Sequence, residues 1–446
     1  MTYDLIIIGG GPGGYEMAAA AAAAGLKVVL VERDYLGGTC LNRGCIPTKA
    51  LCRSAEVVST VRQAQAWGVT TGEMTVDYAA AVARKDQVVS QLRDGVSTLM
   101  QQGGVTVVQG EARFVDAHTI GVGDDTLTAP HVVIATGSAP RGLPIEGAEL
   151  AISSDELLAA TTLPGRLCVV GGGVIGMEFA GIFAAYGVDV TVVEYCKEIL
   201  PPFDKDIAKR LRSVMSKRGV KIVTQAAVKS LTRSDDGIVV AYDAKGKEIT
   251  VTADAVLLSV GRQPVLPAGL EHTAVEVTRR GIAVDEHMLT REPGVYAIGD
   301  VNGLCMLAHA ASAQGMVALH HIFGKPCNID LSIIPSAVFT TPELAMVGLT
   351  EEQCAEQNRE VEVKKSFFRS NGKALAMGET DGLVKMIVDS ATRQIVGCHI
   401  CGAHAADLIQ EVSMTMCCGA TVDDMASAIH GHPTLSEVLQ AVARQF

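Results

Sequence analysis

The sequence predicts an α/β protein in which two similar α/β units are followed by a smaller α+β domain. An apolar strand, a glycine-rich turn, a helix and a second strand occur twice along the chain, and every marker of the second copy lies 162 residues after its counterpart in the first. From about residue 333 onward, strand-like stretches alternate with turns and are followed by two helices, which is typical of an antiparallel sheet covered by helices. The expected strands are residues 337–340, 362–368, 383–389 and 394–400, and the expected helices are a long one at 405–417 and a short one at 422–428. The 446 residues suffice for about three domains.

The composition excludes several classes of protein. Apolar residues make up 48% of the chain and charged residues 19%, which is too apolar for a disordered protein. The formal net charge of −12 argues against general binding to nucleic acid, which needs a positive surface. The first apolar stretch, residues 5–31, is interrupted by Glu16, Lys27 and several glycines, so we expect neither a signal peptide nor a membrane span. These features predict a cytoplasmic protein that binds neither nucleic acid nor membrane.

The first repeated segment has the features of a Rossmann-like dinucleotide-binding unit. Its apolar strand runs into the glycine-rich turn of residues 9–14, and its second strand ends in an acidic residue. Gly9 permits a tight turn, Gly11 lets the backbone approach a pyrophosphate, and Gly14 allows the helix to pack closely on the strand. The helix N-terminus supplies free amides and a partial positive charge for phosphates. Glu32 is placed to accept hydrogen bonds from a ribose.

The second segment repeats all of these markers. Its glycines are Gly171, Gly173 and Gly176, and its second strand ends in Glu194. A single glycine motif is weak evidence, because glycine-rich turns are common, but two complete units with the acid at the same spacing are strong evidence. We therefore expect the chain to bind two dinucleotides. A carboxylate at position 194 would repel a 2′-phosphate, which favours NAD over NADP.

Two cysteines five residues apart follow the first unit. On a regular helix, Cys40 and Cys45 would lie about 140° apart and could not bond. Gly44 lets the backbone distort between them, and Pro47 suits a first helical turn, so we expect Cys45 near a helix N-terminus, where thiolate is favoured. A pair of buried structural thiols is the alternative. The dinucleotide unit directly upstream favours a redox-active pair.

The stretch GGTCLNRGCIPTKAL, residues 37–51, resembles the active-site segment of the pyridine nucleotide–disulfide oxidoreductases. The likeness covers nearly the whole chain, because it includes both dinucleotide units and the later segments VYAIGD, LAHAASAQG and HGHPTLSE. It implies a homodimer in which each subunit has an FAD domain, an NAD domain, a central domain that completes the FAD domain, and an interface domain. On this chain these domains would be residues 1–147, 148–264, 265–332 and 333–446.

The resemblance also implies a reaction. It is greatest to the members that oxidise protein-bound dihydrolipoyl groups and reduce NAD to NADH. Cys40 and Cys45 would form the redox disulfide that passes electrons to FAD. His432 of the other subunit, oriented by Glu437, would take the thiol proton, whereas a bare histidine before proline is more often a turn residue. The lipoyl group would belong to a partner protein of a 2-oxo acid dehydrogenase or glycine cleavage complex. A glutathione- or mercuric-reductase-like enzyme is the alternative.

Further residues are expected beside the cofactors. Lys49 and Glu178 would form an ion pair next to the flavin. Asp300 would meet the ribitol or a phosphate of the flavin nucleotide, with a helix N-cap as the alternative interpretation. The full set expected from the resemblance is Lys49, Thr136, Gly137, Glu178, Gly261, Asp300 and Ala308.

Two other cysteine pairs have structural interpretations. Cys398 and Cys401 have the spacing of a zinc or thioredoxin-type motif, but they lie in an expected strand, where residues three apart point to opposite faces. Cys417 and Cys418 lie in an apolar helix and are expected to pack in the core. We expect no metal site, and we expect most of the twelve cysteines to be reduced and buried.

Overall fold

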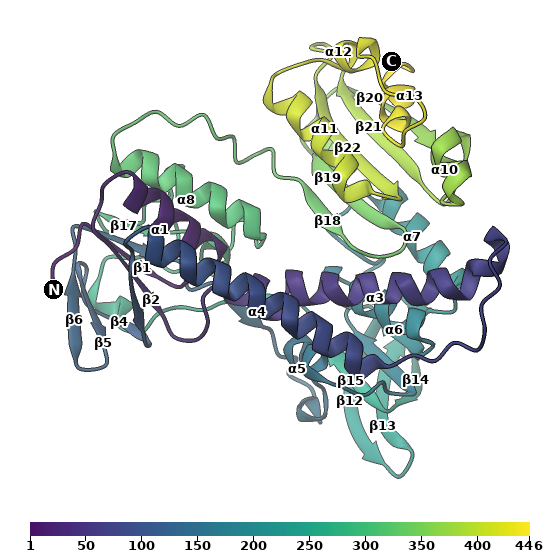
Figure 1. Cartoon of the computed structure of the whole chain (residues 1–446), viewed down its shortest axis with the longest axis horizontal. Coiled ribbons are helices and arrows are strands. Elements are labelled where there is room, and N and C mark those ends of the chain that lie inside the picture. The colour runs from purple at the N-terminus through teal and green to yellow at the C-terminus, as the bar shows by residue number, and fades with distance from the viewer. The chain divides into compact units, whose positions relative to one another are not determined.

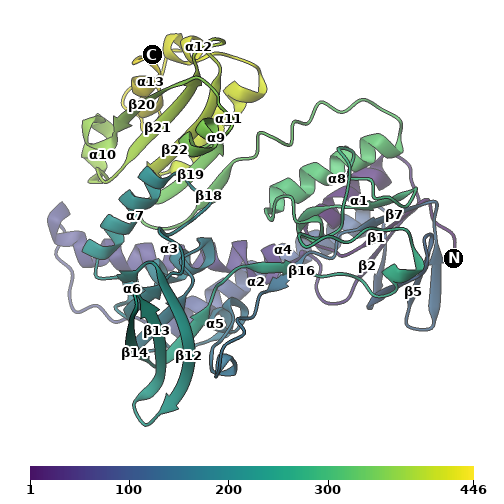
Figure 2. The same ribbon diagram turned by 180° about the vertical axis from the view of Figure 1, so that it is seen from behind.

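The computed structural model describes all 446 residues, and they divide into two compact units (Figures 1 and 2). The first unit comprises Met1–Ala50, Ala79–Arg141 and Gly261–Leu331, and the second comprises Leu51–Tyr78, Gly142–Val260 and Ser332–Phe446. Both contain helices packed on parallel sheets, and the second also contains an antiparallel sheet near the C-terminus. The predicted fold class is therefore confirmed.

The first unit is built on a parallel sheet of five strands in the order β17-β7-β1-β2-β3. β1 lies between β2 and β7, with Leu5 opposite Val28 on one side and His131 on the other. All residues of β1 and β2 are buried, as is usual for strands with both faces covered. In sheet order the strands are Val295–Ala297, His131–Ile134, Leu5–Ile8, Val28–Glu32 and Thr106–Gln109.

The two faces of this sheet have different covers. Ile6 and Ile8 pack into a core with an antiparallel sheet of β4, β5 and β6, whereas Leu5 and Ile7 pack into a core with the helices α1 and α8. Alternate residues of a strand point to opposite faces, so β1 supplies both cores. α1 and α8 lie side by side in Figure 1. The covering elements are β4 (Ala112–Asp116), β5 (Thr119–Val122), β6 (Asp125–Thr128), α1 (Pro12–Ala23) and α8 (Ala308–Ile322).

Three further helices and a short pair of strands complete the first unit or continue from it. α2 and α3 follow the dinucleotide turn, and the long helix α4 leads into β3. β8 and β16 pair in antiparallel fashion. These elements are α2 (Gly38–Arg43), α3 (Cys45–Gln63), α4 (Tyr78–Gln102), β8 (Ser138–Pro140) and β16 (Arg262–Pro264).

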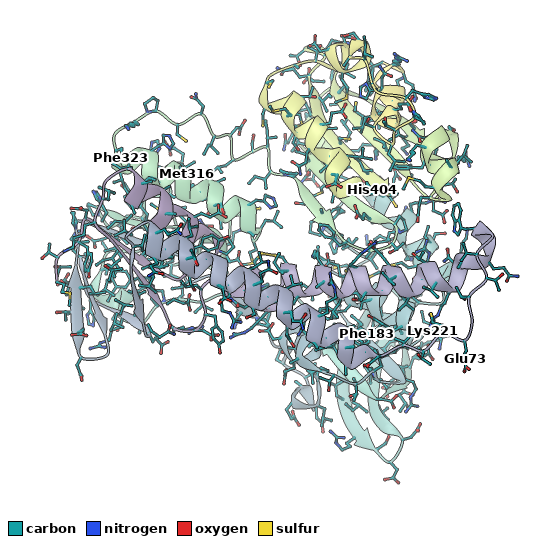
Figure 3. All side chains as sticks on the ribbon, in the orientation of Figure 1. Glu73, Phe183, Lys221, Met316, Phe323 and His404 are labelled. Carbon is teal, nitrogen blue, oxygen red and sulfur yellow. A yellow bond between two sulfur atoms is a disulfide. The ribbon has the colours of Figure 1, made fainter.

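The second unit repeats the central part of the first. Its parallel sheet has the order β11-β10-β9-β15, which matches β3-β2-β1-β7, and α6 follows β9 as α1 follows β1. Phe183 on α6 (Figure 3) is fully buried, with its ring centroid 6.0 Å from that of Tyr78. The strands in that order are Lys221–Val223, Asp189–Val193, Arg166–Val170 and Ala255–Leu258, and the helices are α5 (Ser154–Ala159), α6 (Val174–Tyr186) and α7 (Lys205–Lys217). An antiparallel sheet adds β12 (Ala226–Ser234), β13 (Gly237–Ala244) and β14 (Lys247–Ala253).

The C-terminal part of the second unit is the predicted antiparallel sheet, in the order β18-β19-β22-β21-β20. Its strands in that order are Ser336–Val338, Glu343–Gly348, Ile395–Gly402, Leu383–Asp389 and Val361–Phe367. The expected long helix is α11, and the expected short one is α12. The sequence did not predict β19, α9, α10 or α13. The helices are α9 (Glu351–Glu356), α10 (Gly372–Met377), α11 (Ala405–Cys417), α12 (Val422–Ser427) and α13 (Glu437–Ala443).

The prediction that Cys417 and Cys418 pack in the core is wrong, because both are exposed. The buried stripe of α11 includes Ile409 and Val412 and continues to the partly buried Met416, so the next two residues turn away from the core. The wider prediction that most cysteines are buried is also wrong. Of the ten free cysteines, only four are buried, namely Cys168, Cys354, Cys398 and Cys401.

No helix of the chain combines the length and the apolar character needed to cross a membrane.

Candidate active site and dinucleotide sites

The first glycine turn has free space beside one of its three motif glycines, whereas at the other two even a Cβ atom would collide with backbone. Gly9 has φ +109°, and a Cβ there would lie 2.2 Å from the Ala135 carbonyl oxygen. A Cβ at Gly14 would lie 1.9 Å from the Gly9 oxygen, so this residue lets α1 approach β1. At Gly11 the nearest atom would be 3.9 Å away, the Cα of Gly38. The turn is therefore closely packed against the rest of the protein at Gly9 and Gly14 and open at Gly11.

The second glycine turn has the same geometry. Gly171 has φ +104°, and a Cβ there would lie 2.5 Å from the Ser259 oxygen. A Cβ at Gly176 would lie 2.0 Å from the Gly171 oxygen, whereas at Gly173 it would meet no atom within 4 Å. Gly11 and Gly173 are the N-caps of α1 and α6, and neither helix has a side-chain cap. Their first amides can therefore bind an anion in the space that the glycines leave.

The two predicted acids are held by matching hydrogen bonds. Glu32 accepts from the amides of Gly10 and Asp34, each at 2.7 Å. Glu194 accepts from the amides of Gly172 and Cys196, each at 2.5 Å. Both side chains are buried, and burial raises the pKa of Glu32, although the Gly10 hydrogen bond opposes that shift. Each carboxylate oxygen has a lone pair left for a ribose hydroxyl.

Cys40 and Cys45 form a disulfide across a break between two helices. Cys40 lies in α2, Gly44 follows that helix with φ −141° and ψ −106°, and Cys45 is the first residue of α3. The two Cα atoms are 4.7 Å apart, within the range of ordinary disulfides. The predicted distortion at Gly44 and the helix N-terminus at Cys45 are both confirmed. Partly unpaired amides at the start of α3 favour a thiolate on Cys45 once the disulfide is reduced.

A side-chain brace that the sequence did not predict holds the disulfide segment. Asn42 donates from Nδ2 to the carbonyl oxygens of Leu36 at 3.0 Å and Gly38 at 2.9 Å. Its Oδ1 accepts from Nε of Arg93 on α4 at 2.9 Å, and the Arg93 guanidinium lies 3.8 Å from the ring centroid of Tyr35. The brace therefore joins α2, the loop before it and α4. Arg93 is 51 residues from Asn42, so no local pattern could have indicated it.

Asp300 lies in a second polar network of the first unit. It accepts a hydrogen bond from the Ser138 hydroxyl, to which Arg262 donates from Nε at 2.7 Å. The N-cap of the helix that follows is Leu307, so the N-cap interpretation of Asp300 is wrong. Thr136, Gly137, Gly261 and Ala308 also belong to this unit, with Ala308 as the first residue of α8.

The C-terminal histidine and carboxylate are paired. Nδ1 of His432 lies 3.0 Å from Oε1 of Glu437, the first residue of α13, and the Thr434 amide donates to Oε2 at 2.9 Å. The hydrogen bonds from Thr434 and His432 lower the pKa of Glu437, so this carboxylate stays ionised and orients the imidazole. The His432 side chain is 78% exposed. By contrast, His430 is buried against Glu411, with Nε2 2.7 Å from Oε1.

Two protein-family models match this chain, and together they cover the glycine turns, the disulfide and the C-terminal histidine. The family model of the pyridine nucleotide–disulphide oxidoreductases matches residues 3–315. The dimerisation domain of the same family matches residues 334–443.

The chain belongs to the pyridine nucleotide–disulphide oxidoreductase family.

Several members of this family are similar over their full length. A dihydrolipoyl dehydrogenase of Bacillus subtilis (strain 168) is 40% identical, over 99% of this chain and 97% of the relative. One from Geobacillus stearothermophilus is 39% identical, over 99% and 95%. Among solved structures, the HOCl-induced flavoprotein disulfide reductase RclA from Escherichia coli has a TM-score of 0.88 and 29% identity, over 99% of both chains.

In this oxidoreductase chain, the predicted pair Lys49 and Glu178 lies on two different elements. Lys49 is on α3, in the part that belongs to the first unit, and Glu178 is buried on α6 in the second. Oε1 of Glu178 accepts from the Phe339 amide at 2.9 Å. The ion pair between them stays a prediction.

The other cysteine motif of this oxidoreductase has no sign of metal or redox chemistry. Cys398 and Cys401 are both fully buried in β22, and burial raises the pKa of each thiol to about 12. No group of three or more His, Cys, Asp or Glu side chains is arranged to hold a metal ion.

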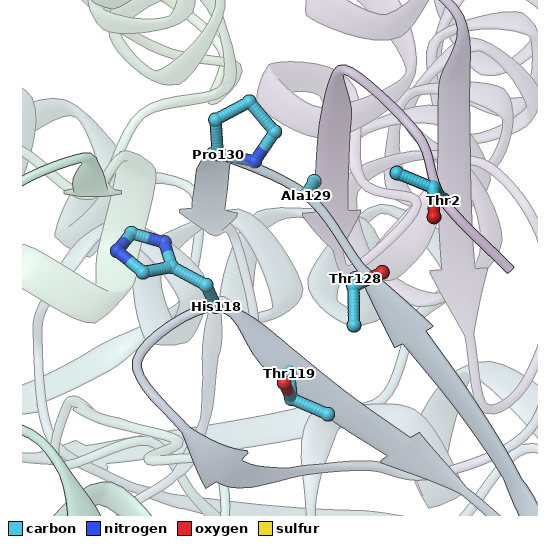
Figure 4. A pocket seen from close by; sticks show the side chains of 6 residues that line it. All are labelled: Thr2, His118, Thr119, Thr128, Ala129 and Pro130. Carbon is cyan, nitrogen blue, oxygen red and sulfur yellow. The ribbon is translucent and has the colours of Figure 1, made fainter.

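A pocket of about 330 Å³ beside β5 and β6 contains none of the predicted site residues (Figure 4). Its lining residues are Thr2, His118, Thr119, Thr128, Ala129 and Pro130.

Proposed function

We propose that the protein is a dihydrolipoyl dehydrogenase, which oxidises protein-bound dihydrolipoyl groups through the Cys40–Cys45 disulfide and FAD and reduces NAD to NADH. The observation that carries the proposal is a disulfide at a helix N-terminus in the same unit as a complete dinucleotide turn. The full-length relatives named dihydrolipoyl dehydrogenase, at about 40% identity, support the choice of substrate.

The open positions in the two glycine turns support the binding of two dinucleotides. We propose that FAD binds to the first unit and NAD to the turn of the second, with pyrophosphates at Gly11 and Gly173 and riboses at Glu32 and Glu194. When bound, FAD and NAD supply the electron-pair transfer that restores the disulfide, a reaction that no side chain performs. The other residues proposed beside FAD are Gly9, Gly14, Lys49, Thr136, Gly137, Glu178, Asp300 and Ala308, and the other residues proposed beside NAD are Gly171, Gly176 and Gly261.

The side chains account for the thiol chemistry of the reaction. His432 takes the proton of one substrate thiol, and Glu437 stabilises the imidazolium that forms. The substrate thiolate attacks the sulfur of Cys40, the disulfide bond breaks, and Cys45 leaves as a thiolate. The second substrate thiol then loses its proton and attacks the substrate sulfur bonded to Cys40, which closes the lipoyl ring. Cys40 leaves as a thiolate and takes up that proton. The substrate loses two electrons and the cysteine pair gains them.

The chain would comprise four domains and act as one subunit of a homodimer. The FAD, NAD, central and interface domains would be residues 1–147, 148–264, 265–332 and 333–446. The enzyme would act as a homodimer, which the match to a dimerisation domain supports, and His432 would serve the disulfide of the other subunit. Its partner would be a lipoyl-bearing protein of a 2-oxo acid dehydrogenase or glycine cleavage complex. The ten free cysteines support a reducing compartment, the cytoplasm.

A cysteine variant tests the function directly. Cys45→Ser should retain FAD, because the glycine turn is intact, but should lose NAD-dependent oxidation of dihydrolipoamide. Cys417→Ser, which removes an exposed free thiol, is the matched control and should keep full activity. Full turnover by Cys45→Ser would exclude the disulfide as the redox relay. The wild-type protein is also assayed with oxidised glutathione and with Hg²⁺, each with NADH and NADPH. Faster turnover of either substrate than of dihydrolipoamide would favour the reductase alternative.

A further inference from the structure

One large aromatic side chain of the second unit stands in solvent. Tyr195 directly follows Glu194 at the end of β10 and is 77% exposed, more than any other aromatic residue of the chain. A phenol ring usually buries most of its apolar surface or finds a partner for its hydroxyl. Exposure of this ring leaves its faces and its hydroxyl accessible to a ligand.

The backbone that carries this ring is held on both sides. The Glu194 amide donates to the Val223 oxygen at 2.8 Å, and the Ala226 amide donates to the Glu194 oxygen at 2.9 Å. The Gln225 amide donates to the Cys196 oxygen at 2.9 Å. The backbone beneath the ring is thus held in place, so a ligand that covers the ring has to order only the side chain and not the chain segment.

The internal repeat locates this position relative to a dinucleotide. Tyr195 is the counterpart of Arg33, which also follows the acid of its unit, 162 residues earlier. The neighbouring bond is repeated, since the Gly110 amide donates to the Glu32 oxygen at 2.9 Å. Arg33, however, forms an ion pair with Glu111 at 3.5 Å, whereas Tyr195 carries an uncharged aromatic ring at the matching position. The repeat therefore differs at the residue beside the ribose-binding acid.

We propose that Tyr195 stacks on the adenine ring of the nicotinamide dinucleotide. The inference rests on the proposed function, in which Glu194 binds the adenosine ribose and Gly173 faces the pyrophosphate. Adenine is attached to that same ribose, so it lies next to the residue that follows the acid. A solvent-exposed aromatic ring on a held backbone offers a flat apolar surface to a base, and such stacking is a recurrent source of affinity for nucleotides.

Calorimetric titration of the FAD-loaded protein with ADP-ribose tests this proposal without turnover. Tyr195→Ala should weaken ADP-ribose binding about tenfold, whereas Tyr195→Phe, which keeps the ring, should stay within about twofold of wild type. The KM for NAD should rise in Tyr195→Ala by a similar factor, with kcat and the melting temperature unchanged. Inhibition by nicotinamide mononucleotide, which lacks adenine, should be equal in all three proteins.

The outcomes separate this inference from the function on which it rests. If wild type does not bind ADP-ribose, the assignment of the second unit to NAD fails, and the inference fails with it. If wild type binds and Tyr195→Ala binds equally well, only the stacking role is overturned. Equal weakening in Tyr195→Phe and Tyr195→Ala would also overturn stacking, because the hydroxyl would then be the contact.

Discussion

Two glycines of the second dinucleotide turn should respond in opposite ways to the same added methyl group. At Gly176, a Cβ would lie 2.0 Å from the Gly171 oxygen and 3.0 Å from Cγ1 of Val169, so main chain must move. Overpacking of this kind costs about 1–3 kcal/mol, and each kcal/mol lowers the melting temperature of a unit of this size by about 2–4 °C. Gly176→Ala should therefore melt several degrees below wild type.

Gly173→Ala should leave the fold intact and abolish the ligand site. No atom lies within 4 Å of the added Cβ, and φ is −75°, which alanine adopts without strain. Loss of chain entropy in the unfolded state should add about 0.4–1 kcal/mol of stability. Alanine is a poorer N-cap than glycine, which opposes this gain, so the melting temperature should change little. The methyl group would occupy the space proposed for the pyrophosphate, so affinity for NAD should fall more than about tenfold, which is 1.4 kcal/mol.

Both variants are measured by thermal melting without NAD and by calorimetric titration with NAD. The two effects should separate, with lost stability in Gly176→Ala and lost affinity in Gly173→Ala. Unchanged NAD affinity in a well-folded Gly173→Ala protein would refute the claim that the open space is the pyrophosphate site. A Gly176→Ala protein as stable as wild type would refute the packing argument.

Three other predictions concern the acid, the brace and the C-terminal dyad. Glu194→Gln should improve kcat/KM for NADPH relative to NADH at least tenfold, because a carboxylate about 4 Å from a 2′-phosphate costs about 4 kcal/mol per unit charge at an effective dielectric constant of 20. Arg93→Ala should destabilise the first unit by about 1.5–3 kcal/mol and speed reduction of the disulfide by dithiothreitol, followed by thiol alkylation, whereas Arg84→Ala on the exposed side of α4 should change neither. Glu437→Gln should lower the melting temperature at neutral pH, because hydrogen bonds to the ionised carboxylate lower its pKa in the folded protein. The difference should begin to shrink below pH 4.5, the ordinary pKa of this carboxyl, and should vanish once the pH has fallen through the lower pKa of the folded protein.

Features set by local sterics could be predicted from the sequence, whereas those made by distant side chains could not. Both glycine turns lie where the repeat predicts them, because an added Cβ at Gly9 or Gly171 would strike backbone. The predicted strand Leu383–Asp389 and helix Ala405–Cys417 match the structure residue for residue, since each has a long apolar pattern. β19 escaped prediction because Glu343, Leu344, Ala345 and Met346 favour helix at least as much as strand, and Val347 is its only β-branched residue.

The missed parts of the site have a common physical origin. The Asn42–Arg93 hydrogen bond joins residues with no periodic relation, and polar side chains at those positions are equally compatible with a solvated surface. The exposure of Cys417 and Cys418 depends on where the buried stripe of α11 ends, which the composition of the helix does not reveal. The residue type thus indicates which reactions or contacts a side chain can make. Whether the side chain is exposed or has a partner depends on where its helix ends and which element packs beside it.

The cysteines of this chain illustrate that distinction most clearly. Cys45 is the first residue of α3, and the amides at a helix N-terminus stabilise a thiolate. Its disulfide partner Cys40 lies on the preceding helix, α2. Cys398 and Cys401 have a spacing that is often reactive, yet burial in β22 raises the pKa of each to about 12 and keeps both protonated. The attacking and leaving groups in thiol–disulfide exchange are thiolates, so only a thiol that can ionise near neutral pH can take part. The location of Cys45 at a helix N-terminus, rather than any cysteine motif, is therefore what makes the Cys40–Cys45 pair the candidate electron carrier.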